Sequence, residues 1–110
     1  MGRGSIMIVP NFPLSGWKNK KGTGERSCKC GSWRNHWLRF SPEPWPTKCA
    51  VDGCNNAATL GAHIFLSGTM SPDNEYIIPT CDSCNKLESQ FSVKSGTIFV
   101  PANRKKTCEK

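Results

Sequence analysis

Long hydrophobic runs are missing from this sequence. Residues 1–9 contain one arginine and a short apolar stretch that Pro10 ends. That stretch is too short for the apolar region of a secretory signal, and no later segment approaches the length of a membrane-spanning helix. We therefore expect a cytoplasmic protein that has no membrane partner.

Apolar residues in general are scarce, and internal repeats are absent. Hydrophobic residues make up 36% of the 110 residues, the mean hydropathy is −0.49, and there are 10 glycines and 8 prolines. A chain of this length and composition has a small core, so a bound metal or a cross-link would add useful stability. We expect one domain at most.

Cysteine is the exception to this scarcity. The seven cysteines are an odd number, and without a secretory signal an oxidising compartment is not expected. Both observations favour metal binding over a disulfide framework, which is the alternative interpretation.

Four of the cysteines form two closely spaced pairs. Cys49 and Cys54 are spaced C-x4-C, and Cys81 and Cys84 are spaced C-x2-C. Each pair can hold one ion from a tight turn, and four thiolates suit a tetrahedral structural zinc with no open coordination position. A redox dithiol at Cys81 and Cys84 is the alternative, but it leaves the first pair without a role.

A second group of metal-binding residue types lies nearer the N-terminus. Cys28, Cys30 and His36 are close together in the sequence, and Cys108 is a distant fourth candidate. These residues could bind a second zinc, which would link the N-terminal half to the C-terminus. The alternative is that the cysteines are free thiols and that the histidine lies on the surface.

The net charge of +7 is unevenly distributed. Residues 1–48 carry nine bases against two acids, and residues 101–110 carry four against one, whereas residues 49–100 are acidic. Basic segments bind polyanions by releasing counterions, so nucleic acid is the leading partner class, with a solvated surface as the alternative. Tryptophan between bases can stack on unpaired nucleotides. The predicted contact residues are Trp17, Lys18, Lys20, Lys21, Arg104, Lys105 and Lys106, whereas Trp33, Trp37 and Trp45 are expected to pack inside the domain.

Secondary structure can be predicted mainly after residue 48. Residues 57–65, with a bulge at Gly61, and residues 75–79 are expected to form strands, joined as a hairpin by the turn-rich residues 67–74. A helix is expected from the second cysteine pair through residues 85–91, and a last strand over residues 95–100.

The predicted fold is therefore α+β, a small treble-clef zinc domain made of a zinc knuckle, a β-hairpin and a short helix. We expect it to span residues 28–100, with its core at residues 48–92. A basic flexible arm (residues 1–27) would precede it, and a basic tail (residues 101–110) would follow.

The order of knuckle, hairpin and helix resembles the HNH, or ββα-metal, family of nucleases over residues 48–92. In family members with a structural zinc, cysteine pairs stand at the positions of Cys49, Cys54, Cys81 and Cys84. His63 matches the second residue of the family's catalytic dyad, which activates water, and Asn85 stands where the last metal-binding histidine is found. Ala62 replaces the first dyad residue, and Ile77 and Ile78 stand where an asparagine orients the base.

The resemblance implies a zinc-stabilised, HNH-like domain that binds nucleic acid and has lost most of its catalytic set. One alternative is an HNH-type endonuclease, with His63 as general base and Asn85 helping to hold Mg²⁺ or another divalent ion. A zinc-built protein-interaction module is another. His63 could also be a core histidine, or a zinc ligand in place of one cysteine.

Overall fold

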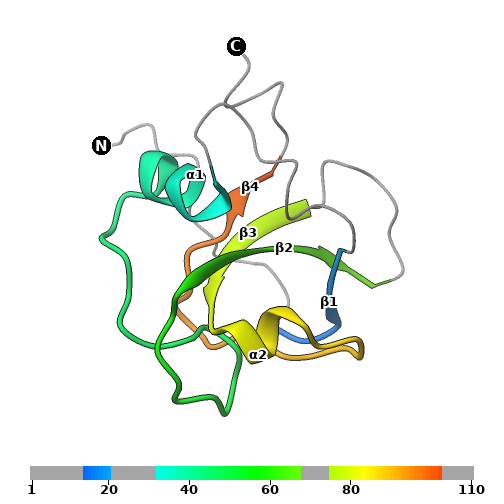
Figure 1. Cartoon of the computed structure of the whole chain (residues 1–110). Helices are drawn as coiled ribbons and strands as arrows, with labels where there is room; N and C mark the ends of the chain where they lie inside the picture. Colours follow the sequence, from blue (N-terminus) through cyan, green and yellow to red (C-terminus); the bar gives the residue numbers. More distant parts are fainter. Residues whose placement is uncertain (1–13, 21–31, 68–74, 103–110) are drawn as a thin grey trace.

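One four-stranded antiparallel sheet separates two helices in the folded chain (Figure 1). The structure, a computed structural model, describes residues 14–20, 32–67 and 75–102. The strand order is β1-β2-β3-β4, so each strand pairs with the next one in the sequence. The strands are β1 (Trp17–Asn19), β2 (Leu60–Leu66), β3 (Glu75–Thr80) and β4 (Val100–Pro101), and the helices are α1 (Trp33–Phe40) and α2 (Asp82–Asn85).

The central hairpin of β2 and β3 confirms the predicted pair of strands. Its register places Ala62 opposite Ile78 and His63 opposite Ile77. Because side chains alternate along a strand, the first of these pairs faces one side of the sheet and the second pair faces the other. The first strand begins at Leu60, later than the predicted residue 57.

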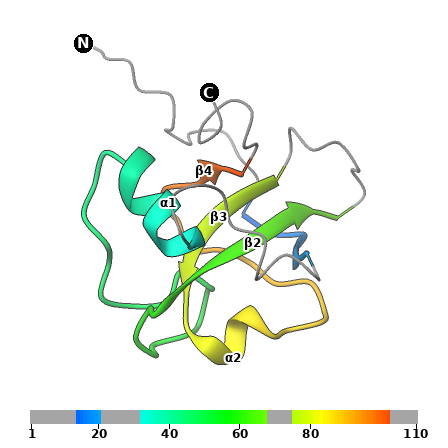
Figure 2. The same ribbon diagram turned by 45° about the horizontal axis from the view of Figure 1, so that its top comes forward.

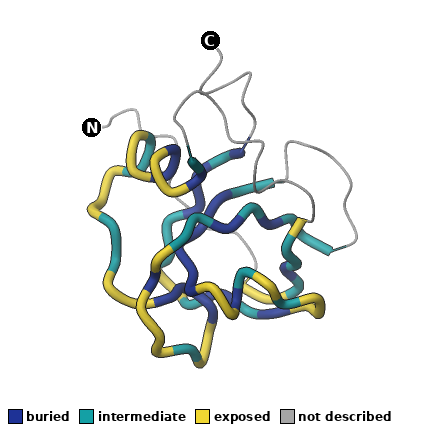
Figure 3. The backbone as a smooth tube through the Cα atoms, in the orientation of Figure 1, coloured by how far each residue is buried: buried dark blue, intermediate teal, exposed yellow. Residues whose placement is uncertain are grey.

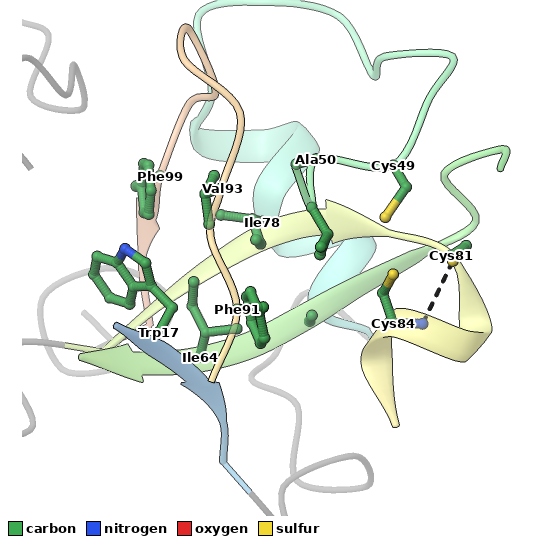
Figure 4. Packing of buried hydrophobic residues seen from close by; sticks show 12 residues of the cluster. Trp17, Cys49, Ala50, Ile64, Ile78, Cys81, Cys84, Phe91, Val93 and Phe99 are labelled. Carbon is green, nitrogen blue, oxygen red and sulfur yellow. Dashed lines mark hydrogen bonds between the residues drawn. The ribbon is translucent and has the colours of Figure 1, made fainter. Parts of the chain in front are cut away.

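Each face of the sheet has its own hydrophobic cluster. The face toward α1, which we call the helix face, has a cluster of Trp33, Trp37, Ile77, Val100 and Ala102. In Figure 2, α1 lies on one side of β2 and β3, the strands against which it packs, and α2 lies on the other side of β2. The cluster on the other side, which we call the cysteine face, is drawn in Figure 4 and contains Trp17, Cys49, Ala50, Val51, Ala62, Ile64, Ile78, Cys81, Cys84, Phe91, Val93 and Phe99.

The edge strand β1 corrects two predictions. It lies within the segment predicted to be a flexible arm, but Trp17 pairs with Leu66 of β2 and its backbone also exchanges hydrogen bonds with Phe91. The Trp17 side chain is 1% exposed, and its ring lies 5.1 Å from that of Phe99. A ring this buried cannot stack on a nucleotide, so the prediction that Trp17 contacts nucleic acid is wrong.

Helix α1 is the element that the sequence analysis missed. The Ser32 side chain caps it by accepting the N–H of Asn35 at 3.0 Å. Aromatic side chains follow at positions 33, 36, 37 and 40, the spacing of one helix face, and those of Trp33, His36 and Trp37 are buried. The burial of Trp33 and Trp37 confirms that these tryptophans pack inside the domain, and Trp45 packs against the same cluster.

Gly61 allows α1 to rest directly on β2. A Cβ atom at this position would lie 2.6 Å from the carbonyl carbon of Trp33 and 2.7 Å from the backbone nitrogen of Arg34. Cβ atoms essentially never make contacts this short, and backbone atoms cannot rotate away from them. The glycine therefore allows α1 to pack closely on β2. A bulge was predicted at Gly61, but the residue pairs with Pro79 in an uninterrupted register.

We expect Gly61→Ala to lower the free energy of unfolding by about 3 kcal/mol, at the upper end of the cost of overpacking. Gly96→Ala is the matched control, because Gly96 has a φ of 88° and nothing within 4 Å of the added Cβ atom. Only backbone strain opposes the control substitution, which should cost about 1 kcal/mol. Urea unfolding of both variants measures the difference, and equal midpoints would refute direct contact between α1 and Gly61.

Two predicted boundaries near the C-terminus are wrong. Helix α2 ends at Asn85, not at residue 91, because the Asn19 amide donates to the carbonyls of Cys84 and Leu87, both at 2.9 Å, where the helix stops. The chain then extends so that Phe91 pairs with β1. The last strand covers only Val100–Pro101, since residues 95–99 make no ladder with β3.

Candidate metal centre

A tight turn holds the first cysteine pair. The N–H of Cys54 donates to the carbonyl of Val51 at 3.0 Å, and Gly53 supplies a positive φ of 85° within this turn. The left-handed conformation strains residues that carry a Cβ atom, so glycine suits this position. Cys49 is anchored separately, because its N–H donates to the Asn56 carbonyl at 2.9 Å.

The second cysteine pair lies at the start of α2. Strand β3 ends at Thr80, and the next residue, Cys81, is the N-cap of the helix. The Sγ atom of Cys81 accepts the N–H of Cys84 at 3.4 Å, as the dashed line in Figure 4 shows. This capping bond fixes both thiols on a single helical turn beside the end of the hairpin.

The four thiols converge. The Sγ atoms of Cys49, Cys54, Cys81 and Cys84 all lie within 4.8 Å of one another, and all four are free cysteines. With a Zn–S distance of about 2.3 Å, neighbouring sulfurs of a tetrahedral site would be about 3.8 Å apart. Cys54 Sγ and Cys81 Sγ are 3.8 Å apart. The donor set and its spacing therefore fit a metal ion such as zinc.

Polar groups around the cluster stabilise negative charge on sulfur. Burial alone would raise the pKa of Cys81, but the Cys84 N–H and the Asn56 amide, whose Nδ2 atom is 3.7 Å from the sulfur, lower it to about 6. Burial raises the pKa of Cys84 and of Cys49. Because metal binding requires thiolates, Cys81 is the thiol prepared to lose its proton first.

The sequence analysis missed two residues of this site. Asn56 donates to a sulfur, as described above, and Lys94 donates from Nζ to the Cys54 carbonyl at 2.6 Å. Groups of this kind orient metal ligands and offset their charge. The proximity of Asn56 to Cys54 in the sequence was a usable signal, whereas Lys94 comes from a segment 40 residues away.

His63 is not part of the cysteine cluster. It lies on the helix face, where its Nε2 is 2.7 Å from Glu75 Oε1 and its ring is 5.0 Å from that of Trp33. Glu75 also pairs with Lys20 at 3.0 Å, and although burial opposes ionisation, the bonds from Lys20 and His63 lower the pKa of the carboxyl group. The alternative that His63 replaces a cysteine at the zinc site is therefore wrong.

The structure does not bring His63 and Asn85 together. The register of the hairpin directs His63 to the helix face, whereas the turn that carries Asn85 packs on the cysteine face through Cys84. The sheet separates the two residues that an HNH-type site would place around one divalent ion. The described residues therefore offer His63 a hydrogen bond with Glu75, not a shared metal site with Asn85.

The predicted second zinc site stays a prediction. Its histidine, His36, lies on the buried face of α1, where Nε2 donates to the Pro101 carbonyl at 2.8 Å, so the alternative of a surface histidine is wrong. Burial lowers the pKa of His36, so the ring is neutral near pH 7. The other three predicted ligands, Cys28, Cys30 and Cys108, lie outside the described residues.

Only some of the predicted nucleic-acid contacts belong to the described residues. Lys18 and Lys20 belong to or follow the edge strand, and Lys20 is exposed while paired with Glu75. The other predicted contacts lie outside the described ranges: Lys21, Arg104, Lys105 and Lys106. Neither helix of the described ranges has the length and apolar character to cross a bilayer.

Comparison with known proteins identifies no relative. No family model matches the chain, and no curated protein and no solved structure is significantly similar to it. The functional argument therefore rests on the geometry of the chain's own residues.

Proposed function

We propose that this chain is a zinc-stabilised domain of treble-clef type, similar to the HNH fold, that binds nucleic acid. The observation that carries the proposal is the convergence of four thiols from two turns, with the sulfurs within 4.8 Å of one another. The order of elements supports the treble-clef assignment, because a cysteine turn precedes the β2–β3 hairpin and the second pair begins α2.

The role proposed for zinc is structural. Cys49, Cys54, Cys81 and Cys84 would fill all four tetrahedral positions, so no position is left for water or substrate. Three of the four residues are buried, which suits an ion that supports a fold better than one that meets a substrate. Bound zinc would tie the knuckle to the end of the hairpin.

Nucleic acid is the proposed partner because of charge. The chain carries 15 bases against 8 acids, and a net charge of +7 on so small a domain favours polyanions. Catalysis is not part of the proposal, since His63 and Asn85 lie on opposite faces of the sheet.

Binding of labelled DNA and RNA oligonucleotides, followed by fluorescence anisotropy during a KCl titration, tests this proposal. We expect the logarithm of the association constant to fall linearly with the logarithm of salt, by about 0.9 for each phosphate contact on a duplex. Absence of binding to both polymers at low salt would contradict nucleic-acid binding and favour the protein-interaction module.

A further inference from the structure

We propose that the outer surface of α1 is the contact surface for nucleic acid, and that the ligand is the major groove of duplex DNA. This inference rests on the proposed function and identifies the surface that performs it. The surface consists of Arg34, Asn35, Leu38 and Arg39, which we call the outer stripe.

The outer stripe is polar, basic and exposed along one side of the helix. All four of its residues are exposed, and even Leu38 keeps 42% of its surface accessible (Figure 3). Their positions, 34, 35, 38 and 39, follow the helical repeat on the side opposite the buried aromatic residues. No residue of α1 is acidic, so the two arginines make the helix basic.

Bases outnumber acids on the helix face of the sheet. Lys18 lies opposite Phe65 in the register, which places it on the helix face with His63, and Lys20 reaches Glu75 on that same face. With the two arginines of α1, four bases lie on the helix face, against Glu75 and against Glu43, which closely follows α1 in the chain. The other described bases, Lys48, Lys86 and Lys94, equal in number the other described acids, Asp52, Asp82 and Glu88. A polyanion is therefore attracted to the helix face.

The chain also leaves the described part beside α1. Ala102, the last described residue, belongs to the cluster that packs beneath Trp33 and Trp37. The sequence continues from there with Arg104, Lys105 and Lys106. The described chain therefore ends on the same face as the outer stripe.

The dimensions and side chains of α1 favour duplex DNA. An α-helix with its side chains is about 10–12 Å in diameter, and the major groove is about 12 Å wide, so the exposed side of α1 can enter it. Arginine and asparagine are the side chains that bond guanine and adenine edges in this groove. Arg34 is already ordered, because its guanidinium lies 4.7 Å from the centre of the Trp45 ring, and so it loses less entropy on binding.

Two double variants that each remove two positive charges test the inference on the zinc-loaded full chain. Arg34→Gln/Arg39→Gln alters the outer stripe, and Lys48→Gln/Lys86→Gln is the matched control at two exposed lysines outside α1. Affinity for a fluorescein-labelled DNA duplex is measured by anisotropy across a KCl titration, and urea unfolding verifies that both variants fold. We expect the first variant to lose roughly tenfold or more in affinity at low salt. The slope of the logarithm of its association constant against the logarithm of the salt concentration should become about 2 less steep, and both quantities should stay unchanged in the control.

The other outcomes separate the inference from the proposed function. Equal losses in the two variants, or no loss in either, would overturn α1 as the contact surface while leaving nucleic-acid binding intact. Tighter binding of single-stranded RNA than of the duplex would overturn the choice of ligand. Failure of the wild-type chain to bind any nucleic acid would overturn the proposed function, and this inference with it.

Discussion

The substitution Cys84→Ser should remove one zinc ion per chain and leave the domain largely unfolded at neutral pH. Serine is close to cysteine in size, so packing changes little, but a neutral hydroxyl is a far poorer zinc ligand than a thiolate. Structural zinc contributes about 10–16 kcal/mol of apparent binding free energy in small zinc domains. This binding free energy is as large as the whole free energy of unfolding of a typical domain, about 5–15 kcal/mol. Losing the ion should therefore cost the fold.

Ser83→Ala is the matched control for this experiment. Ser83 is exposed in the same turn of α2, between the two cysteines, and it contributes no thiol. Native mass spectrometry counts the bound zinc, and amide dispersion in a nitrogen–proton NMR spectrum reports folding. The control should match the wild type in both measurements. An unchanged zinc count in Cys84→Ser would refute the four-thiol cluster as a metal site.

Trp17→Ala should lower the free energy of unfolding by about 3–5 kcal/mol, the usual cost of deleting a fully buried aromatic side chain. Trp17 is 1% exposed and contacts Phe99 and Tyr76, whose ring centres lie 5.1 and 6.0 Å away. Its removal leaves a cavity between the edge strand and the cysteine face. Urea unfolding in excess zinc measures the loss without a change in metal occupancy.

Leu14→Ala provides the comparison for Trp17→Ala. Leu14 lies in the same segment but is 44% exposed, so its truncation should change stability by less than about 0.5 kcal/mol. The two variants also distinguish packing from ligand contact. If Trp17→Ala folded with wild-type stability but bound nucleic acid more weakly, the buried position of this ring would be refuted.

The sequence predicted best those features that depend on neighbouring residues. The β2–β3 hairpin follows from two short apolar stretches on either side of a turn-rich segment, and the spacing of the cysteine pairs led directly to the cluster. Helix α1 carried an equally local signal, the Ser32 cap and aromatic residues at helical spacing. It was overlooked because the histidine and tryptophans of this segment also suggested ligands and base stacking.

Other features depend on contacts that no local pattern contains. The end of α2 is decided by Asn19, which is 65 residues from Cys84 in the sequence. Strand β1 has only three residues, and it forms because Trp17 finds a buried position against residues from the other end of the chain. Which face of the sheet His63 occupies likewise follows from the register of the hairpin, which sets it apart from Asn85.

The bond from Asn19 to the carbonyls of Cys84 and Leu87 has a consequence for cooperativity. It joins the outermost strand to the turn that supplies two of the four thiols, so neither can open without exposing polar groups of the other. The backbone amides of β1 and of the turn with Cys81 and Cys84 should therefore exchange their hydrogens in one cooperative opening, as a single foldon. An ion bound to the four thiols would then protect β1 from exchange without touching it.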